Sequence, residues 1–270
     1  MDWRENDGVR WLEADLGGAR VAFGTRLGGV SPAPFNSLNI GILTEDSNEN
    51  AIENRRRLAT ALGFVPERVA YGLQVHGAEL ETVPSSFRGS FCTPQDQKEP
   101  RDGLAEVDGQ VIGEPGVAGL VFTADCLPVA LRGPGGVAMV HCGWRGLAGG
   151  IVAKAAAAVG ASSAAIGPGI GPCCYEVGPE VLAAFADLGD GITADGPNSG
   201  DMGPQSAHRH LDLAEVARRL LTRAGVKRVE AAGLCTSCEA ELFFSHRRDA
   251  GHTGRQGSLA WLEPEGSGRG

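Results

Sequence analysis

The sequence lacks the long apolar run, the basic leader and the positive charge on which membrane-spanning, exported and nucleic-acid-binding proteins rely. No stretch approaches the roughly 18 consecutive apolar residues that cross a bilayer as a helix. The opening MDWRENDGVRWLEADLGG is polar and acidic, unlike a signal peptide. With 24 basic and 33 acidic residues the net charge is −9, which repels phosphate backbones and acidic membrane surfaces. We therefore expect a cytoplasmic protein that has neither a nucleic acid nor a membrane as its partner.

Several common frameworks are missing as well. The seven cysteines are an odd number in a chain of 270 residues, which is typical of reduced thiols and not of a disulfide scaffold. The 41 glycines follow no fixed period, which excludes collagen-like and solenoid folds. The glycine-rich IGPGIGPCCYEVG matches neither a P-loop nor a dinucleotide fingerprint. No G-x-S-x-G motif is present, so serine hydrolase chemistry has no signature here.

Three segments carry apolar residues at helical spacing: 47–64, 146–161 and 211–226. Gly63 and Gly225 are expected to end the first and third helices, and Asp212 to cap the start of the third. Short apolar runs predict strands at RVAFGT, RVAYGLQVHG, DGQVIG, GLVFTADCLPVAL, GVAMVHC, SAAIGPGI, RVEAAGLC and ELFFS.

The helices and strands mix without strict alternation, which favours a layered α+β fold over a doubly wound sheet. No change of composition marks a linker, so we predict a single domain over residues 1–270. Irregular loops are expected at 84–101 and 189–206, and a disordered tail at 263–270.

Three metal-binding side chains follow apolar runs: His76 in LQVHG, Cys126 in FTADC and His141 in MVHCG. Two imidazoles and a thiolate suit a catalytic zinc site, which is tetrahedral and keeps its fourth position open. The separations of 50 and 15 residues match no compact zinc-binding motif, so the fold would have to assemble such a site. The alternative is that the three residues are unrelated and half-buried.

Neighbouring side chains on a strand point to opposite faces, which separates His141 from Cys142. If His141 faces a pocket, Cys142 packs on the other side as a small apolar residue. The same argument separates Asp125 from Cys126, unless the strand has already ended there.

Arginines indicate a local anion site in an otherwise acidic chain. Arg145 lies where a strand leads through a glycine turn into a helix, and exposed N–H groups at such a start bind anions. Arg247, Arg248 and Arg255 lie among the glycines of SHRRDAGHTGRQG. Guanidinium groups bind phosphate or carboxylate through paired hydrogen bonds. The alternatives are surface ion pairs and a solvated loop.

The remaining cysteine motifs are interpreted structurally. CTSC, Cys235 to Cys238, has the spacing of a redox motif or half of a zinc site, but it lacks a second pair and a following thioredoxin-type helix. We interpret both cysteines as packing residues. The adjacent Cys173 and Cys174 are assigned to a turn-rich connector and are not expected to form a disulfide.

Taken together, the motifs resemble a known family. GTRLGGVSPAPFNSLNIG, NRRRLATALG, QVHG, TADCLPV, VHCGWRG, IGPGIGPCCYEVG, CTSC and LFFSHRRDAGHTGRQG occur in the order found in the purine nucleoside phosphorylase YfiH/LACC1 family. Older names of this family are the multicopper polyphenol oxidase (laccase) domain family and the peptidoglycan editing factor family. The resemblance covers about residues 21–262 and implies a layered αββα sandwich with mixed sheets.

The resemblance implies a zinc enzyme that phosphorolyses adenosine, inosine, guanosine and methylthioadenosine and deaminates adenosine. It puts one Zn²⁺ per chain on His76, Cys126 and His141 and makes these three residues catalytic, while Cys142 stands where the family has a small residue. Asp125 is the expected proton-transfer carboxylate. Asn39, Gln74, Arg145, Arg247 and Arg248 are the expected contacts to nucleoside or phosphate.

Three alternatives from other classes stay open beside this one. The first is a copper polyphenol oxidase, which needs more histidines than the six scattered ones readily supply. The second is a metal-free Cys–His hydrolase with Cys126 as nucleophile, and the third an amidase that edits a peptidoglycan precursor. A non-catalytic binding module would not need three converging ligands. We expect a monomer or a small homo-oligomer.

Overall fold

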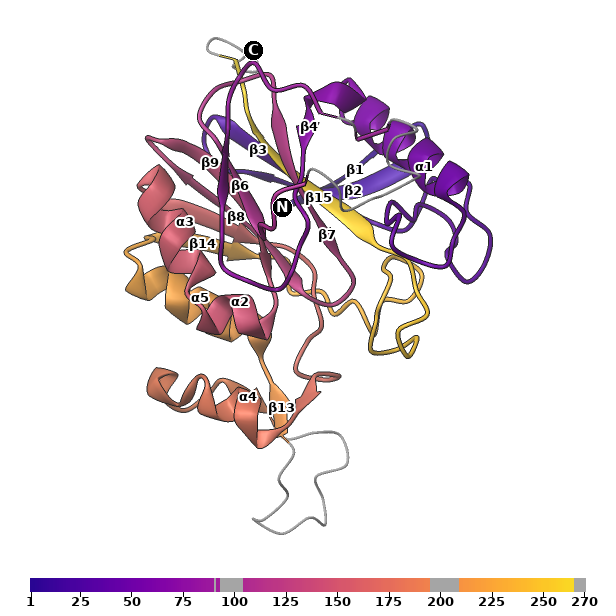
Figure 1. Ribbon diagram of the computed structural model, residues 1–270. Helices are drawn as coiled ribbons and strands as arrows, with labels where there is room; N and C mark the ends of the chain where they lie inside the picture. The colour runs from indigo at the N-terminus through magenta and orange to yellow at the C-terminus, as the bar shows by residue number, and fades with distance from the viewer. Residues whose placement is uncertain (90, 93–103, 195–208, 265–270) are drawn as a thin grey trace.

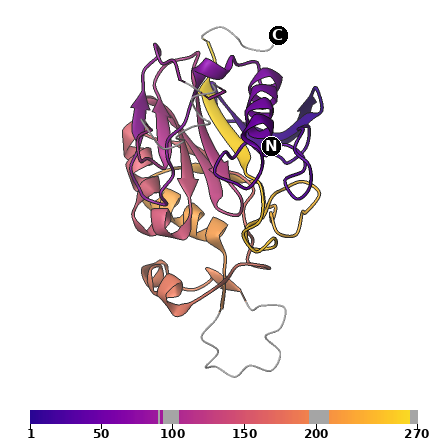
Figure 2. The same ribbon diagram turned by 45° about the vertical axis from the view of Figure 1, so that its right-hand side comes forward.

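Two six-stranded sheets pack face to face, with helices on both outer faces (Figure 1). The computed structural model describes residues 1–89, 91–92, 104–194 and 209–264. Figure 2 shows the same layers from a second side, with α1 (Asn48–Ala61) on one outer face and α3 (Ile151–Val159) and α5 (Leu213–Arg223) on the other.

The first sheet joins the two ends of the chain. Its order is β1 (Asp2–Asn6), β2 (Val9–Asp15), β3 (Ala19–Gly24), β15 (Gln256–Leu262), β7 (Ala118–Thr123) and β4 (Val69–Ala70). Neighbouring strands are antiparallel except β4 and β7. This sheet is therefore mixed, and its central strand β15 comes from the far end of the sequence.

The second sheet is also mixed. Its order is β14 (Arg228–Ala231), β10 (Ser163–Ile166), β8 (Leu127–Gly133), β9 (Gly136–Cys142), β6 (Gly109–Ile112) and β5 (Glu81–Val83). The pairs β10–β14 and β5–β6 are parallel and the others antiparallel. Below the sandwich in Figures 1 and 2, β13 (Arg209–Leu211) and α4 (Pro179–Ala183) protrude; β13 pairs with β11 (Glu176–Val177) and β12 (Thr193–Ala194).

Three apolar clusters fill the three interfaces between these layers. One lies between the sheets and contains Phe23 and Met139, another lies under α1 around Leu58, and the third lies under α3 and α5 around Val140. All seven residues of β9 are buried, because helices cover one face of this strand and the first sheet the other. The predicted α+β fold of αββα type with mixed sheets is confirmed.

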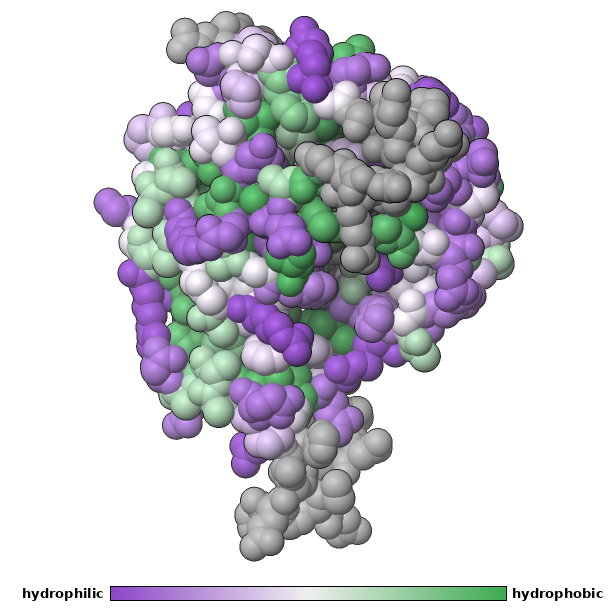
Figure 3. All heavy atoms as spheres, viewed as in Figure 1, coloured by the Kyte–Doolittle hydropathy of each residue, from purple (hydrophilic) through white to green (hydrophobic). Residues whose placement is uncertain are grey.

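Hydrophilic side chains cover the α1 side of the face drawn in Figure 3, and smaller apolar areas interrupt them toward the centre. Most large apolar side chains lie inside the layers instead, although Trp3, Leu43 and Val65 are exposed. In the described part of the chain no helix combines the length and the apolar character that a bilayer crossing needs.

The first and third predicted helices are confirmed as α1 and α5. Ser47 caps α1 and Asp212 caps α5, each by accepting a backbone N–H of the first turn. Gly63 and Gly225 follow these helices with positive φ. The middle helix prediction is wrong in part, because 146–161 breaks into α2 (Trp144–Ala148) and α3 at Gly150, which has φ +82°.

Several strand predictions are also wrong. RVAYGLQVHG forms only the two-residue β4, GLVFTADCLPVAL turns between β7 and β8, and ELFFS forms no strand. Strands β1, β2 and β15 had no counterpart among the predicted elements. Of the tail 263–270 only Glu263 and Pro264 are described, and the Glu263 N–H donates to Gly18 O. The expected loops 84–101 and 189–206 lie partly outside the described residues.

Candidate active site and metal centre

His76, Cys126 and His141 come together at one end of the sandwich. His76 lies in the loop after β4, Cys126 in the turn between β7 and β8, and His141 near the end of β9. Their ligand atoms all lie within 4.8 Å of one another, and the two imidazole rings are 4.9 Å apart. Two nitrogens and one sulfur at this separation can hold a tetrahedral zinc ion whose fourth position stays open.

A buried carboxylate orients one of these ligands. Asp108 Oδ1 lies 2.8 Å from His141 Nδ1, so the other ring nitrogen, Nε2, is left for the metal. The Asp108 carboxylate also accepts the backbone N–H groups of Val75, His76 and Gly77 at 3.2, 3.1 and 2.7 Å. One side chain therefore fixes both the tautomer of His141 and the backbone that carries His76.

The charges of Cys126 and His141 support each other. Burial raises the pKa of the Cys126 thiol, but the positive charge and hydrogen bond of His141 outweigh it and lower that pKa to about 6. Burial lowers the pKa of His141, but the charge of Cys126 and the hydrogen bond to Asp108 raise it to about 9. The site thus favours a thiolate, which is the form of cysteine that binds metal or attacks as a nucleophile.

Both members of the Asp125–Cys126 pair reach the site, because β7 ends at Thr123 and alternation no longer applies. Asp125 has φ +96° and His76 has φ +59°, conformations that residues other than glycine rarely adopt and that concentrate at functional sites. Asp125 Oδ1 accepts the Thr236 hydroxyl at 2.7 Å, and Oδ2 accepts the Arg247 N–H at 2.7 Å. These bonds hold the carboxylate at the cavity wall.

Cys142 behaves as strand alternation predicted. It is fully buried in the cluster under α3 and α5, away from the three ligands. Burial raises the pKa of its thiol well above the ordinary value. Among the described residues the metal-binding groups do not include Cys142.

A cavity of about 480 Å³ contains this group and reaches a set of arginines. The volume lies in the range of roughly 300–1,000 Å³ that is typical of small-molecule sites. Arg145, Arg247 and Arg255 line it together with Tyr175. Arg145 is exposed and its guanidinium lies over the Trp144 ring at 4.5 Å, with no hydrogen bond or ion pair to another of the described residues. Its guanidinium is available to an anion.

The other predicted binding residues are engaged elsewhere. Gln74 lines the cavity, but its amide exchanges two hydrogen bonds with the backbone of Phe122. Asn39 is buried, bonds Thr44 and Asp46, and lies outside the cavity lining. Arg248 also lies outside the lining, where it pairs with Asp249 and binds three backbone carbonyls.

Four residues of the site were not selected from the sequence as site residues: Arg55, Asp108, Tyr175 and Thr236. Arg55 is buried in α1 and lies over the rings of Tyr71, Phe91 and Phe122. In the sequence it is one of several arginines of a predicted helix, and nothing local distinguishes it. Asp108 had a local signal, a carboxylate directly before the apolar run GQVI. Burial raises the pKa of Tyr175 to about 12, so this hydroxyl stays protonated and can donate.

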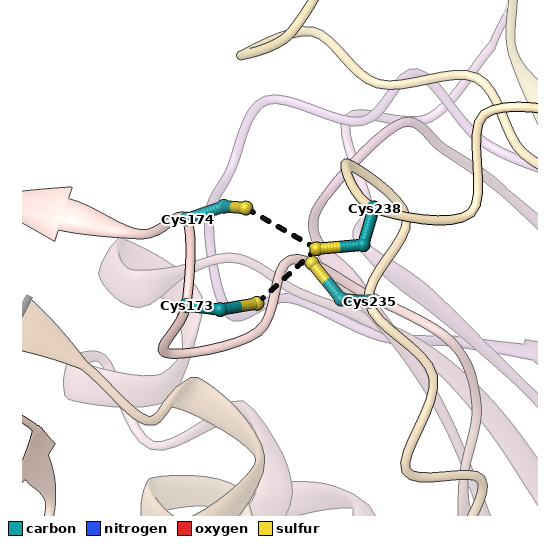
Figure 4. A group of neighbouring side chains, drawn as sticks. All are labelled: Cys173, Cys174, Cys235 and Cys238. Carbon is teal, nitrogen blue, oxygen red and sulfur yellow. Dashed lines mark hydrogen bonds between the residues drawn. The ribbon is translucent and has the colours of Figure 1, made fainter. Parts of the chain in front are cut away.

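A second group of ligands lies outside the cavity. The sulfurs of Cys173, Cys174, Cys235 and Cys238 also lie within 4.8 Å of one another (Figure 4). The expectation that CTSC lacks a second pair of cysteines is therefore wrong. The second pair is the adjacent Cys173 and Cys174, whose spacing is not that of C-x-x-C.

Known proteins are similar to this chain in fold and sequence. A family model described as multi-copper polyphenol oxidoreductase laccase matches residues 20–263. Purine nucleoside phosphorylase YlmD of Geobacillus stearothermophilus is 39% identical over 260 residues, which cover 91% of this chain and 92% of that protein. Purine nucleoside phosphorylase YfiH of Escherichia coli (strain K12) is 34% identical over 252 residues, 91% of this chain and 94% of that protein.

Solved structures agree. The crystal structure of YlmD from Geobacillus stearothermophilus has a TM-score of 0.84 at 34% identity and covers 97% of this chain and 98% of its own. That of Bacillus licheniformis hypothetical protein YfiH has a TM-score of 0.82 at 31% identity and covers 97% and 99%. Fold and site together define this protein as an αββα sandwich with a His–Cys–His group at one end. Within that class, the chain belongs to the multi-copper polyphenol oxidoreductase laccase family, which it shares with YfiH and YlmD.

Proposed function

We propose that this protein is a zinc-dependent purine nucleoside phosphorylase that also deaminates adenosine. The observation that carries the proposal is one cavity with a His–Cys–His group on one wall and four arginines around it, Arg55, Arg145, Arg247 and Arg255. The names of the relatives support the same substrates, purine nucleosides and phosphate. Adenosine, inosine, guanosine and methylthioadenosine are the proposed nucleosides, handled in the cytoplasm by a monomer or small homo-oligomer that acts on neither nucleic acid nor membrane.

His76, Cys126 and His141 would hold one zinc ion per chain. Their donor set, two imidazole nitrogens and a thiolate with a carboxylate behind one imidazole, fits zinc. A zinc ion held there would supply a Lewis acid at the cavity wall. All three residues line the cavity, so a ligand that fills it meets the metal centre.

In phosphorolysis an oxygen of phosphate forms a bond to the anomeric carbon of ribose while the bond from that carbon to the purine nitrogen breaks. The electron pair of the broken bond goes to the purine, which must then gain a proton. Arg145 and Arg247 would hold the phosphate through charge-assisted hydrogen bonds and orient it for attack. The protonated hydroxyl of Tyr175 lies in the same cavity and is a hydrogen-bond donor for the substrate.

In deamination water adds to the purine carbon that bears the amino group, and ammonia leaves. A proton must move from the water to the leaving nitrogen, and Asp125 is the carboxylate at the cavity wall. Each of its oxygens accepts one bond from the protein and keeps a further lone pair for a proton. Asn39 and Arg248 would then act indirectly, by positioning the loops around the cavity.

One observation favours a second candidate function, a Cys–His hydrolase that cleaves an amide of a peptidoglycan precursor. Cys126, His141 and Asp108 are arranged as nucleophile, base and orienting carboxylate, and the lowered pKa of Cys126 suits attack. Copper is the lower-ranked metal, because multicopper sites need more histidines than the two that the described residues bring to this group.

The deciding experiment is incubation of the pure protein with adenosine, with and without phosphate, followed by chromatography. Adenine that appears only with phosphate indicates phosphorolysis, and inosine indicates deamination. Arg145→Ala should raise the KM for phosphate by tenfold or more, whereas Lys154→Ala, on the exposed face of α3, should not. If neither product forms and a precursor amide is cleaved by metal-free protein, the nucleoside proposal fails.

A further inference from the structure

Four cysteines from two distant segments form a compact group that the active site does not use. Cys173 and Cys174 lie in the turn before β11, and Cys235 and Cys238 lie in the loop after β14. Their side chains point toward one another across the gap between these loops (Figure 4). Cys238 Sγ lies 3.4 Å from Cys173 Sγ and 3.5 Å from Cys174 Sγ, and all four sulfurs lie within 4.8 Å of one another.

These separations fit a shared metal ion better than covalent bonds. A disulfide joins its sulfurs at about 2.05 Å, well below the separations here. Four thiolates around one zinc ion at about 2.3 Å each lie about 3.8 Å apart at the corners of a tetrahedron. Packing does not account for the group either, because Cys173 and Cys238 are exposed and none of the four is fully buried.

The backbone around the group is shaped for sulfur ligands. The Gly171 N–H donates to Cys235 Sγ at 3.2 Å, a contact that favours the thiolate. A Cβ on Gly171 would meet Cys235 Cβ at 3.2 Å and Cys173 Sγ at 3.4 Å, so glycine lets the two loops approach. The N–H groups of Cys238 and Glu239 both donate to Cys235 O, which closes the C-x-x-C turn.

Positive charge lies beside the group. Arg247 Nη1 approaches Cys174 O at 3.5 Å, and Arg248 Nη1 donates to Thr236 O at 2.9 Å and to Ser237 O at 3.4 Å. A zinc ion with four thiolates carries a net charge of about −2, which the Arg247 guanidinium offsets in part, while Arg248 is paired with Asp249.

We propose that Cys173, Cys174, Cys235 and Cys238 form a second metal site, a closed tetrahedral thiolate site for Zn²⁺. It shares no ligand with the cavity and all four positions are filled by the protein, so its role is structural. The ion ties the turn that leads to Tyr175 to the loop that carries Thr236. Tyr175 lines the cavity, and Thr236 holds Asp125, so the second site supports one wall of the first.

The test is the zinc content of the full-length protein, purified under reducing conditions, by elemental analysis. We expect two zinc ions per chain in the unchanged protein and one in Cys173→Ser/Cys238→Ser. Cys92→Ser, a cysteine outside both groups, should keep two. The proposal is overturned if the unchanged protein and the double serine variant contain the same amount of zinc, whether or not the cavity site is filled.

A second variant keeps the test decisive if the serine variant does not fold. His76→Ala/His141→Ala removes two ligands of the cavity site and leaves the four cysteines intact. X-ray absorption of the zinc that it retains should show sulfur ligands alone. Absence of that zinc, or nitrogen among its ligands, contradicts the proposal. So does an intact mass of the reduced-purified protein that is lower by two hydrogens per disulfide within this group.

Discussion

Asp108 shows how much of the proposed metal centre depends on one side chain that is not a ligand. It is fully buried, and its carboxylate bonds His141 Nδ1 and three backbone N–H groups of the loop around His76. An amide at this position could accept fewer of these bonds and would carry no negative charge to favour them. The two imidazole ligands would then lose their common support.

We expect Asp108→Asn to weaken zinc binding at the cavity site by about 10- to 100-fold, the usual effect of removing a carboxylate behind a histidine ligand. Competition with a chromogenic chelator measures this affinity. Glu79→Gln is the matched control, because it removes one exposed carboxylate that pairs only with Lys154 among the described residues. Equal affinities in the two variants would mean that Asp108 does not orient His141.

Cys126 and Cys142 have different roles: Cys126 belongs to the proposed metal centre, and Cys142 packs in the core. Cys126→Ser should lose the cavity zinc and the activity. Cys142→Ser should keep the zinc and the activity. It would, however, put a hydroxyl into an apolar cluster, which should lower the free energy of unfolding by about 1–3 kcal/mol. Zinc content and urea denaturation distinguish the two effects. Loss of zinc in Cys142→Ser would contradict the assignment of this thiol to the core.

At the scale of elements, local signals predicted the helices better than the strands. Ser47 and Asp212 are capping residues with glycines after the helix, so α1 and α5 could be located within a few residues. The run RVAYGLQVHG is apolar enough for a long strand, yet it leaves the sheet after Ala70 and reaches His76 at φ +59°. After Ala70 its residues line the cavity and do not pair in a sheet, and the spacing of apolar residues does not show this difference.

Strand β15 was missed for a different reason. Its partners β3 and β7 lie far away in sequence, and its first residues, Gln256, Gly257 and Ser258, are weak strand formers. Tertiary pairing decides such a strand. The break between α2 and α3 was also not visible in the sequence. The alanine-rich segment favours a continuous helix, and the interruption appears only in the positive φ of Gly150.

Two glycines flanking α2 should therefore respond differently to alanine. A Cβ on Gly143 would meet Cys126 Sγ at 3.1 Å and His76 Cδ2 at 3.3 Å, so Gly143→Ala should displace the ligands and weaken zinc binding on the order of tenfold, about 1.4 kcal/mol. A Cβ on Gly150 meets nothing within 4 Å but would force alanine into φ +82°, at about 1–2 kcal/mol of stability.

Chelator competition and urea denaturation on both variants measure the two effects separately. Gly150→Asn should recover part of the stability lost in Gly150→Ala, because asparagine tolerates positive φ. Unchanged zinc affinity in Gly143→Ala, or weakened affinity in Gly150→Ala, would refute the assignment.

At the scale of the whole molecule, the site is assembled from segments that span most of the chain. The cavity wall includes residues 41–44, 71–74, 122–126, 141, 143–145 and 246–247. The sequence identified His76, Cys126 and His141 because each follows an apolar run, and the resemblance to a family added their common role. It could not show that Asp108 lies behind His141 or that Cys173 meets Cys238, because those contacts depend on how the two sheets and the loops beyond them pack.

Two metal sites that form only in the folded chain should contribute separately to its stability. At free zinc about 100 times the dissociation constant, one such site adds about 2.7 kcal/mol to the free energy of unfolding. We expect His76→Ala/His141→Ala and Cys173→Ser/Cys238→Ser each to keep one zinc-dependent increment, and the combined variant to keep none. Chemical denaturation with and without zinc measures the increments. If the histidine variant gains no stability from zinc, the four cysteines do not hold the two loops together through a metal. The cavity wall formed by Tyr175 and Thr236 would then be held by packing and hydrogen bonds alone.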